Sequence, residues 1–422
     1  MTNPLGAARQ GLSEVLEPAL QPMRQLRAKR EFKWVFIAVV LALVIIYPQF
    51  DNSVHINVAF TAEVYVLLAL GLNVVIGYAG LLDLGYAAFF AIGAYTIADL
   101  GSSFFAPAHK FSIPLLHFGP TGIHLNFWLL IPIAALTAAL CGVLFGAPTL
   151  RLRGDYLAIV TLGFGEIVPL VIRNLGQNNS LGLPNLTNGV NRITGIDSPP
   201  NIHIASTHIS FQGLDPRPWY YLGLIIVVFS IIVIYSLRQS RLGRAWAAIR
   251  EDEIAAAHMG INITRTRLMA FGLGAAFSGF AGMIYASYVG SVEASSFDFS
   301  ISVMILLMVI LGGMGSIPGV IIGAILLKYL DLLWLDDINS GLKSFGHAIH
   351  TGPGPVGPIG NFLFQLNLGS ARPLIFGAIL LIMMLLRPQG LWPSSTRARE
   401  LHPDTEDISE EENVELYTAR TE

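Results

Sequence analysis

Long apolar runs recur along this chain and constrain its fold more than any other feature. A helix of about 20 apolar residues spans the roughly 30 Å hydrocarbon core of a bilayer. Ten runs approach that length: residues 34–50, 58–77, 83–101, 126–146, 156–173, 219–237, 267–289, 300–314, 317–335 and 371–387. Asp83 and Asp99 interrupt the third, and the eighth is short enough for a half-helix. The sequence predicts an all-α, polytopic membrane protein with about ten transmembrane helices.

The composition supports this class and excludes two others. Of the 422 residues, 53% are hydrophobic and only 13% are charged, and the mean hydropathy is +0.61. Soluble domains carry roughly 25% charged residues, so an ordinary water-soluble enzyme is excluded. Disorder is excluded because it requires low hydrophobicity. The single cysteine, Cys141, rules out an intramolecular disulfide and a cysteine-based metal site, and we read it as a small buried apolar residue.

Basic clusters predict the orientation, because cytoplasmic loops retain Lys and Arg. Such clusters precede residue 34, follow the fourth run at Arg151 and Arg153, fill the loop between 238 and 267, and follow residue 387. All four lie on one side only if the number of spans between them is even, and ten spans satisfy this. We therefore expect both termini to be cytoplasmic.

The same arrangement predicts three parts of the chain. Residues 1–33 are a cytoplasmic extension, residues 34–392 the transmembrane domain, and residues 393–422 an acidic cytoplasmic tail. From Glu400 onward nine residues are acidic and one, Arg420, is basic. The rest of the chain then carries a net charge of only +5, which does not suggest a nucleic-acid surface. Two long outside loops, 174–218 and 336–370, are either docking segments for an external partner or plain connections.

Ionisable residues inside the predicted spans are candidate functional residues, because charge is costly in a bilayer. They are Glu63, Asp83, Asp99, Glu166, Lys328 and Asp331. Most lie near span ends, where their polar groups reach the interface. Glu166 is the deepest. It either bonds a neighbouring helix or faces a translocation path, and Asp83 is kept as a candidate for the same two roles.

Small residues repeat every four positions in the seventh run. Gly274, Ser278, Gly282, Ala286 and Gly290 form this series. Because lipid supplies no hydrophobic drive between helices, small residues mark close helix contacts in membranes. The series predicts a tightly packed seam, and lining of a translocation path is the alternative.

Known catalytic motifs are missing. The dipeptide Gly-Lys never occurs, so the chain has no Gly-Lys-Ser/Thr phosphate loop with which to hydrolyse ATP. It also has no His-Glu-x-x-His pair and no Gly-x-Ser-x-Gly elbow. We expect no catalytic residues, no cofactor and no metal site.

The largest inside loop, residues 239–262, carries the most informative segment. It is rich in alanine and charge, favours helix, and has Gly260 at a plausible C-terminal stop. A short helix here would present the small residues Ala256 and Ala257 to a cytoplasmic partner, with Arg250 and Glu253 orienting it. An ordinary loop helix is the alternative.

Five ordered blocks resemble one family. Glu253, Ala256, Ala257 and Gly260 resemble the Glu-Ala-Ala…Gly coupling motif of ABC importer permeases. The chain is similar more specifically to LivM-type permeases of branched-chain or neutral amino acid importers. The similar blocks are residues 77–90, 150–157, 243–262, 311–319 and 387–392.

This resemblance implies partners and a mechanism. A permease of this type pairs with a second, related permease and two ATP-binding cassette subunits in the bacterial inner membrane, and a periplasmic binding protein delivers the amino acid. The coupling helix transmits ATP-driven motion, and specificity lies mainly in the binding protein. Urea permeases of the same family tend to have Ser-Leu-Gly-His where this chain has Asp83-Leu84-Gly85-Tyr86, which favours amino acids. A urea or short-amide permease and a stand-alone secondary transporter stay open as alternatives.

Overall fold

The computed structural model describes residues 41–105, 123–150, 152, 155–176, 185–204, 207–211, 215–350, 371–387 and 389–392. The predicted N-terminal extension, the acidic tail and the Gly-Pro-rich stretch 352–358 lie outside these residues. By contact the chain divides into two units, Met1–Ile56 and Asn57–Glu422. In the first, the described part consists of helix Leu41–Phe50 and the start of helix α3.

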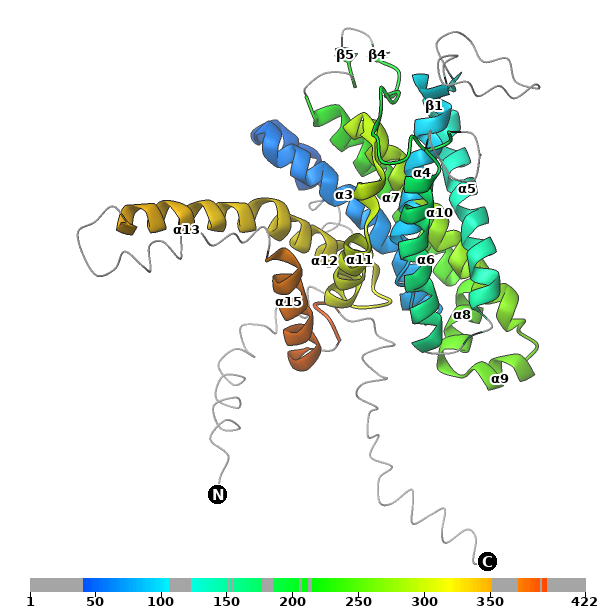
Figure 1. Cartoon of the computed structure of the whole chain (residues 1–422). Coiled ribbons are helices and arrows are strands. Elements are labelled where there is room, and N and C mark those ends of the chain that lie inside the picture. The colour runs from blue at the N-terminus through cyan, green and yellow to red at the C-terminus, as the bar shows by residue number, and fades with distance from the viewer. Residues whose placement is uncertain are drawn as a thin grey trace, which may run out of the picture. The chain divides into compact units, whose positions relative to one another are not determined.

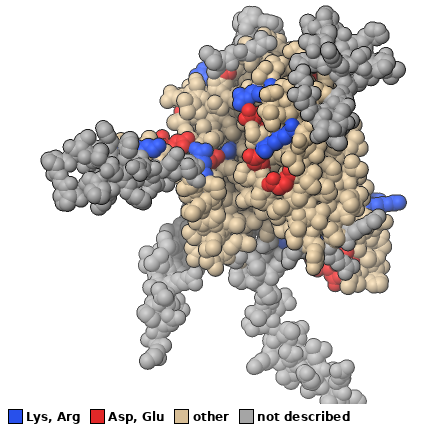
Figure 2. All heavy atoms as spheres, viewed as in Figure 1, with Lys and Arg blue, Asp and Glu red and all other residues tan. Residues whose placement is uncertain are grey.

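Each of the ten predicted runs corresponds to an apolar helix among the described residues. Seven helices are long and apolar enough to cross a membrane: Ser53–Tyr78, Phe127–Thr149, Tyr156–Asn174, Arg217–Gln239, Ile263–Val289, Ala294–Gly312 and Ile317–Ser344. Three are shorter: Leu41–Phe50, Ala87–Leu100 and Arg372–Leu386. On the face shown in Figure 2, charged atoms gather in small groups and leave broad areas uncharged, as a lipid-facing surface requires. The prediction of a polytopic helical membrane protein is confirmed.

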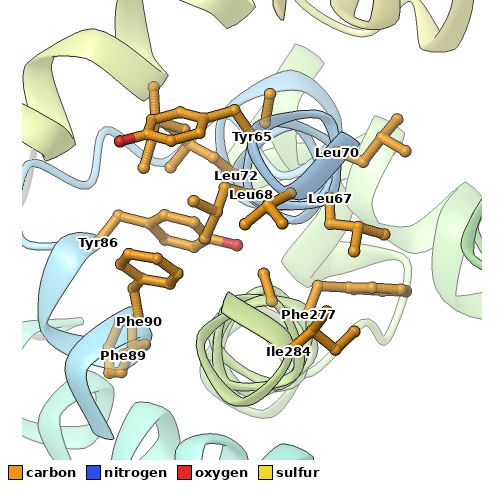
Figure 3. Close-up of a cluster of buried hydrophobic side chains, with 14 of the residues drawn as sticks. Tyr65, Leu67, Leu68, Leu70, Leu72, Tyr86, Phe89, Phe90, Phe277 and Ile284 are labelled. Atoms are coloured by element: carbon orange, nitrogen blue, oxygen red, sulfur yellow. The ribbon is translucent and has the colours of Figure 1, made fainter. Parts of the chain in front are cut away.

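The core of the second unit forms around helix α3, Ser53–Asn73, and its π-helical continuation η1, Val74–Tyr78. Figure 3 shows leucines of α3 facing aromatic side chains that precede and begin helix α4, Ala87–Leu100, and side chains of helix α10, Ile263–Val289. Leu68, Tyr86 and Ile284 are all fully buried there. The apolar residues of α3 cover most of its circumference, which is typical of a helix enclosed by others.

Helix α10 packs closely on α4 and on helix α5, Phe127–Thr149, through small residues. A Cβ added to Gly93 of α4 would lie 2.0 Å from the carbonyl oxygen of Gly279, and one added to Gly142 of α5 would lie 2.6 Å from the Cβ of Ala275. These backbones approach one another as close as glycine and alanine allow, and such contact replaces the missing hydrophobic drive between helices.

The remaining helices complete the second unit. They are α6 (Asp155–Asn174), α7 (Arg217–Gln239), α8 (Arg241–Glu251), α9 (Glu253–His258), α11 (Phe299–Gly312), α12 (Ile317–Tyr329), the π-helix η5 (Leu330–Trp334), α13 (Leu335–His350), α15 (Arg372–Leu386) and the 3₁₀ turns η2 (Ser103–Phe105) and η4 (Ala294–Phe297). Figure 1 places α8 and α9 at one end of the unit and β1, β4 and β5 at the other.

Among the described residues, three short antiparallel ladders connect segments between the helices. Strand β1 (Gly101–Ser102) pairs with β2 (Ile123–His124), β3 (Ile193–Thr194) with β6 (Ser291–Val292), and β4 (Ile202–Ile204) with β5 (Thr207–Ile209). An isolated bridge joins Ser102 to Ile196. The predicted outside loop 174–218 therefore holds three of these strands, and β3 ties it to the end of α10.

Two predicted boundaries are wrong. The third run was predicted as helix from residue 83, but α4 begins at Ala87, because Gly80 has a positive φ of 69° and the Asp83 side chain accepts a hydrogen bond from Gly85 N. Residues 336–350 are helical instead of loop. The ninth span continues through η5, where Asp331 pairs with Lys328, into α13, whose apolar residues lie on one face.

Candidate functional site

The predicted single helix in loop 239–262 is two helices, α8 and α9, separated at Asp252. Ser240 caps α8 by accepting hydrogen bonds from the amides of Leu242 and Gly243. Asp252 is extended and caps α9 by accepting from the amides of Ile254 and Ala255. Each cap satisfies amides that a helix start leaves without partners, so the chain turns at Asp252 instead of continuing. Gly260 has a φ of 83° and follows the end of α9, a conformation that favours glycine.

Two side chains fix this pair of helices to the first residues of α10. The Trp246 side chain of α8 is fully buried and its Nε1 donates to Thr266 O over 2.8 Å. Glu253 of α9 accepts two hydrogen bonds from the guanidinium of Arg267, at 2.8 and 3.2 Å. A bidentate Arg–carboxylate pair fixes orientation as well as distance. The start of α9 is therefore held in one orientation against α10.

The other side of α9 is exposed. Ala256 is buried, whereas Ala257 is exposed and Ile254 and Met259 are 70% and 83% exposed. The predicted coupling residues thus divide: Glu253 and Ala256 face the helical bundle, and Ala257 lies on the free face with two large apolar neighbours. Exposed apolar groups on a polar loop are typical of a protein-binding surface.

Arg250, near the end of α8, reaches the end of the core helix. Its Nη1 donates to the carbonyl of Gly77 in η1. Gly80, with its positive φ, lies so close that a Cβ would be 3.1 Å from Arg250 Cγ. A π-helical turn lengthens the hydrogen-bond spacing of a helix and occurs frequently at functional sites. Arg250 therefore joins the loop helices to an irregular turn at the end of the most buried helix.

Asn73 carries this connection further. It is fully buried just before η1, and its Oδ1 accepts a 2.8 Å hydrogen bond from Gly315 N, in the turn between α11 and α12. The end of α11, beside this turn, bonds residues near the C-terminal end of the described chain, because Leu391 N donates to Leu311 O and Trp392 N to Gly312 O. Two hydrogen bonds, joined by the backbone of residues 73–77, therefore link α8 through η1 to the α11–α12 turn.

Asp83 lies in the irregular segment between η1 and α4, within the helical bundle. Its side chain is 2% exposed, and the neighbouring Leu84 N donates to Thr161 Oγ1 of α6. Tyr86 donates from its hydroxyl to Gly274 O over 2.7 Å. Non-helical backbone at membrane depth persists only where protein or a polar cavity surrounds it. The side chains of Asp83, Phe89, Phe145, Thr161 and Phe164 line a small pocket beside this segment.

The other pathway or packing candidates lie in two environments. Gly274, Ser278 and Gly282 are buried in α10, where Gly282 abuts Phe90 O of α4 and Gly274 abuts Val75 of η1. They lie in helix contacts of this chain. Glu166 differs, because it is exposed on the outer surface of α6 and has no hydrogen bond or ion pair with any described residue.

Ion pairs gather near the end of the unit opposite α8 and α9. Arg192, before β3, contacts Glu293, after β6, at 2.9 Å, and Arg173 contacts Asp298 at 3.0 Å. The hydrogen bonds from Arg192 and from Ser295 hold the pKa of the Glu293 carboxyl below its ordinary value. The pair is therefore formed above that ordinary value and is lost as the pH falls through the lowered pKa.

Sequence reasoning missed four residues that shape the site. Asn73, Trp246 and Arg267 anchor the loop helices and their connection, and Arg372 contacts Asp331 beside the buried Lys328. A lone asparagine inside an apolar run was a visible signal for Asn73. Arg267 had no such signal, because its pairing with Glu253 depends on how the chain turns at Asp252 and Gly260.

Known proteins resemble this chain over most of its length. A family described as "Branched-chain amino acid transport system / permease component" matches residues 54–386. The high-affinity branched-chain amino acid transport system permease protein LivM of Escherichia coli (strain K12) is 37% identical over 85% of this chain and 75% of its own. A probable LivM of Methanocaldococcus jannaschii is 24% identical over 78% and 90%. The LivH permease of Escherichia coli (strain K12) is 24% identical over 64% and 81%. No solved structure matches significantly.

Proposed function

The chain belongs to the permease-component family of branched-chain amino acid transport systems, and on that premise we propose that it is the membrane-spanning subunit of an ATP-driven importer of branched-chain or other neutral amino acids. It is a multi-pass membrane protein and a permease, and the names of its relatives support the substrate class. It works in the inner membrane with both termini cytoplasmic, and a periplasmic binding protein supplies the amino acid.

The energy comes from partner subunits in this proposal. Two ATP-binding cassette proteins bind the cytoplasmic end, and a second, related permease completes the membrane part. The sequence contains no phosphate loop of its own. The exposed face of α9, with Ile254, Ala257 and Met259, is the surface that an ATPase subunit covers. Small and apolar side chains there permit close contact over a short helix.

One observation carries the mechanism: α8 and α9 are bonded to the bundle at three points. Glu253 is bonded to Arg267, Trp246 to Thr266, and Arg250 to Gly77. When the ATPases close, a displaced α9 moves α10 through the Glu253–Arg267 bond, and α8, moving with α9, displaces η1 through the Arg250–Gly77 bond. Asn73 then passes the displacement of η1 to the α11–α12 turn at Gly315. Helix α10 and the α11–α12 turn therefore shift together, which is what alternating access requires.

The test uses the complete importer in proteoliposomes, with ATP hydrolysis and leucine uptake measured in parallel. Glu253→Gln weakens the bond to Arg267, so uptake per ATP hydrolysed should fall about tenfold while hydrolysis continues. Glu251→Gln is the matched control, since Glu251 is exposed and has no ion pair with described residues. If uptake per ATP hydrolysed stays at the parental value in Glu253→Gln, α9 does not couple ATP hydrolysis to transport.

A charge exchange strengthens this test. Glu253→Arg alone and Arg267→Glu alone each place two like charges on the order of 3 Å apart, where the Glu253–Arg267 pair now lies. Each single variant should therefore uncouple transport. The double exchange restores an ion pair with reversed direction and should recover part of the lost coupling. If the double variant is no better than either single one, the pair does not transmit motion and serves only to fold the loop.

A further inference from the structure

One side of α6 carries a carboxylate and a glycine among large exposed side chains. Tyr156 and Ile159 are 71% and 64% exposed, Glu166 is exposed, and Leu170 is 57% exposed. A Cβ added to Gly163 would meet nothing within 4 Å. The spacing of three and four residues places all five positions on one side of the helix. We call these five residues the α6 stripe.

Glu166 lies near the middle of helix α6 on this stripe. Helix α6 runs from Asp155 to Asn174. At 1.5 Å per residue, Glu166 is about 16 Å from one end and about 12 Å from the other, too deep to reach an interface without a long detour. A charged side chain at the centre of a bilayer is costly, so such residues face protein or a water-filled cavity.

The other deep carboxylates of the chain are sheltered, and Glu166 is not. Asp331 is 6% exposed and is paired with Lys328 and Arg372. Asp83 is 2% exposed and accepts a hydrogen bond from Gly85 N. Glu166 alone among these three points outward, with no partner among the described residues. Its partner therefore lies outside the described residues.

Two other candidate membrane-spanning helices have exposed faces of a different kind. In α5, the residues Leu136, Leu140 and Leu144 are 60%, 61% and 67% exposed and repeat every four positions. In α7, Ile225, Phe229 and Ile232 are at least 59% exposed. These surfaces are wholly apolar. The α6 stripe has a carboxylate and a glycine at the depth where α5 has leucines, so lipid is the wrong neighbour for it.

From this placement we infer that the α6 stripe lines the water-filled passage of the importer, and that Glu166 binds the ammonium group of the amino acid in transit. The inference rests on the proposed function. A neutral amino acid carries an ammonium group, to which a carboxylate at mid-depth is complementary, while Ile159 and Leu170 on either side contact an apolar side chain. The α6 stripe then faces the aqueous passage rather than lipid.

The first experiment measures which surface water reaches. The chain has one cysteine, Cys141. In a Cys141→Ser background, each new cysteine is therefore the one thiol of this chain that the reagent can label. The assembled importer in membrane vesicles is treated with a charged, membrane-impermeant methanethiosulfonate from each side. Two matched series carry the new cysteines: Ile159→Cys, Gly163→Cys and Leu170→Cys in α6, and Leu136→Cys, Leu140→Cys and Leu144→Cys in α5.

The α6 series should react at least tenfold faster than the α5 series, and leucine with its binding protein and ATP should change the α6 rates. Equal, slow reaction of both series would place the α6 stripe in lipid or in a dry contact and would overturn the inference. Leucine uptake by the Cys141→Ser parent is measured in the same vesicles. Failure of the parent to import leucine would count against the proposed function instead.

The second experiment tests the carboxylate. Glu166→Gln should lower leucine uptake about tenfold or more, and Glu166→Asp should restore a substantial part of it, because the ammonium group needs a negative partner. Both variants should assemble with the partner subunits and hydrolyse ATP. Normal uptake by Glu166→Gln, or equal loss in both variants, would show that Glu166 does not bind the ammonium group.

Discussion

Single glycines set how near the helices of this bundle come to one another. At Gly93 of α4, an added Cβ would lie 2.0 Å from Gly279 O and 2.4 Å from Gly279 Cα. Since both groups belong to backbone, neither can turn away. The contact between α4 and α10 therefore depends on the absence of one methyl group.

Gly93→Ala should separate α4 from α10. The free energy of unfolding should fall by at least the roughly 1–3 kcal/mol that overpacking costs. Gly377→Ala is the control, because it also lies in an apolar helix and its Cβ would meet nothing within 4 Å. The measurement is the thermal midpoint and the yield of monodisperse protein in detergent. A Gly93→Ala protein as stable as Gly377→Ala would show that the backbones shift apart without cost.

Asn73 is a polar residue in an apolar core, and its side chain stabilises the fold through one hydrogen bond. Asn73→Ala leaves the amide of Gly315 without its acceptor in a buried place, which costs about 1–3 kcal/mol. We expect a lower thermal midpoint together with reduced uptake per ATP. Ser236→Ala is the comparison, because the exposed Ser236 hydroxyl bonds only within its own helix. Equal midpoints and equal coupling in both variants would contradict a role for Asn73 in connecting η1 to the α11–α12 turn.

At the scale of elements, the break between α8 and α9 depends on a capping residue. Asp252→Ala removes the acceptor of two α9 amides and should cost about 1 kcal/mol of helix stability. A six-residue helix has little stability of its own, so α9 should fray and coupled uptake should drop. Asp252→Asn keeps an oxygen acceptor and should behave as the parent does. Hydrogen exchange of the loop amides measures the fraying directly, and unchanged protection in Asp252→Ala would contradict it.

The sequence predicts elements correctly where an apolar pattern extends over many residues. It fails where a single local hydrogen bond sets the boundary of a helix. Each of the ten apolar runs is found as a helix, because length and hydropathy add over many residues. The start of α4 at Ala87 was missed because the local bonds of residues 80–86 outweigh an apolar pattern. The break at Asp252 was missed because a continuous alanine-rich run reads as one helix. The candidate coupling residues lie in α8, in α9 and just after α9, and only the fold shows which of them are buried and which are exposed.

At the scale of the whole molecule, the proposed mechanism depends on three connected layers. The outer layer is α9 with its free apolar face, and the middle layer is α8 with Arg250 and η1. The inner layer is the α3–α4–α10 core of Figure 3, which contacts the α11–α12 turn through Asn73. The sequence has no Gly-Lys-Ser/Thr phosphate loop, and in the proposed mechanism the displacement enters from partner subunits through α9.

The chain alone should therefore accumulate nothing. A hundredfold concentration of leucine inside a vesicle requires about 2.7 kcal/mol, since each tenfold step requires about 1.4 kcal/mol. Proteoliposomes with the purified chain alone, supplied with ATP or with a proton or sodium gradient, should show no uphill uptake and no ATP hydrolysis. Addition of the second permease, the ATPases and the binding protein should give uphill uptake that stops when ATP is withdrawn. Gradient-driven accumulation by the chain alone would identify a secondary transporter and refute the importer subunit, because its energy would then enter through the chain itself and not through α9.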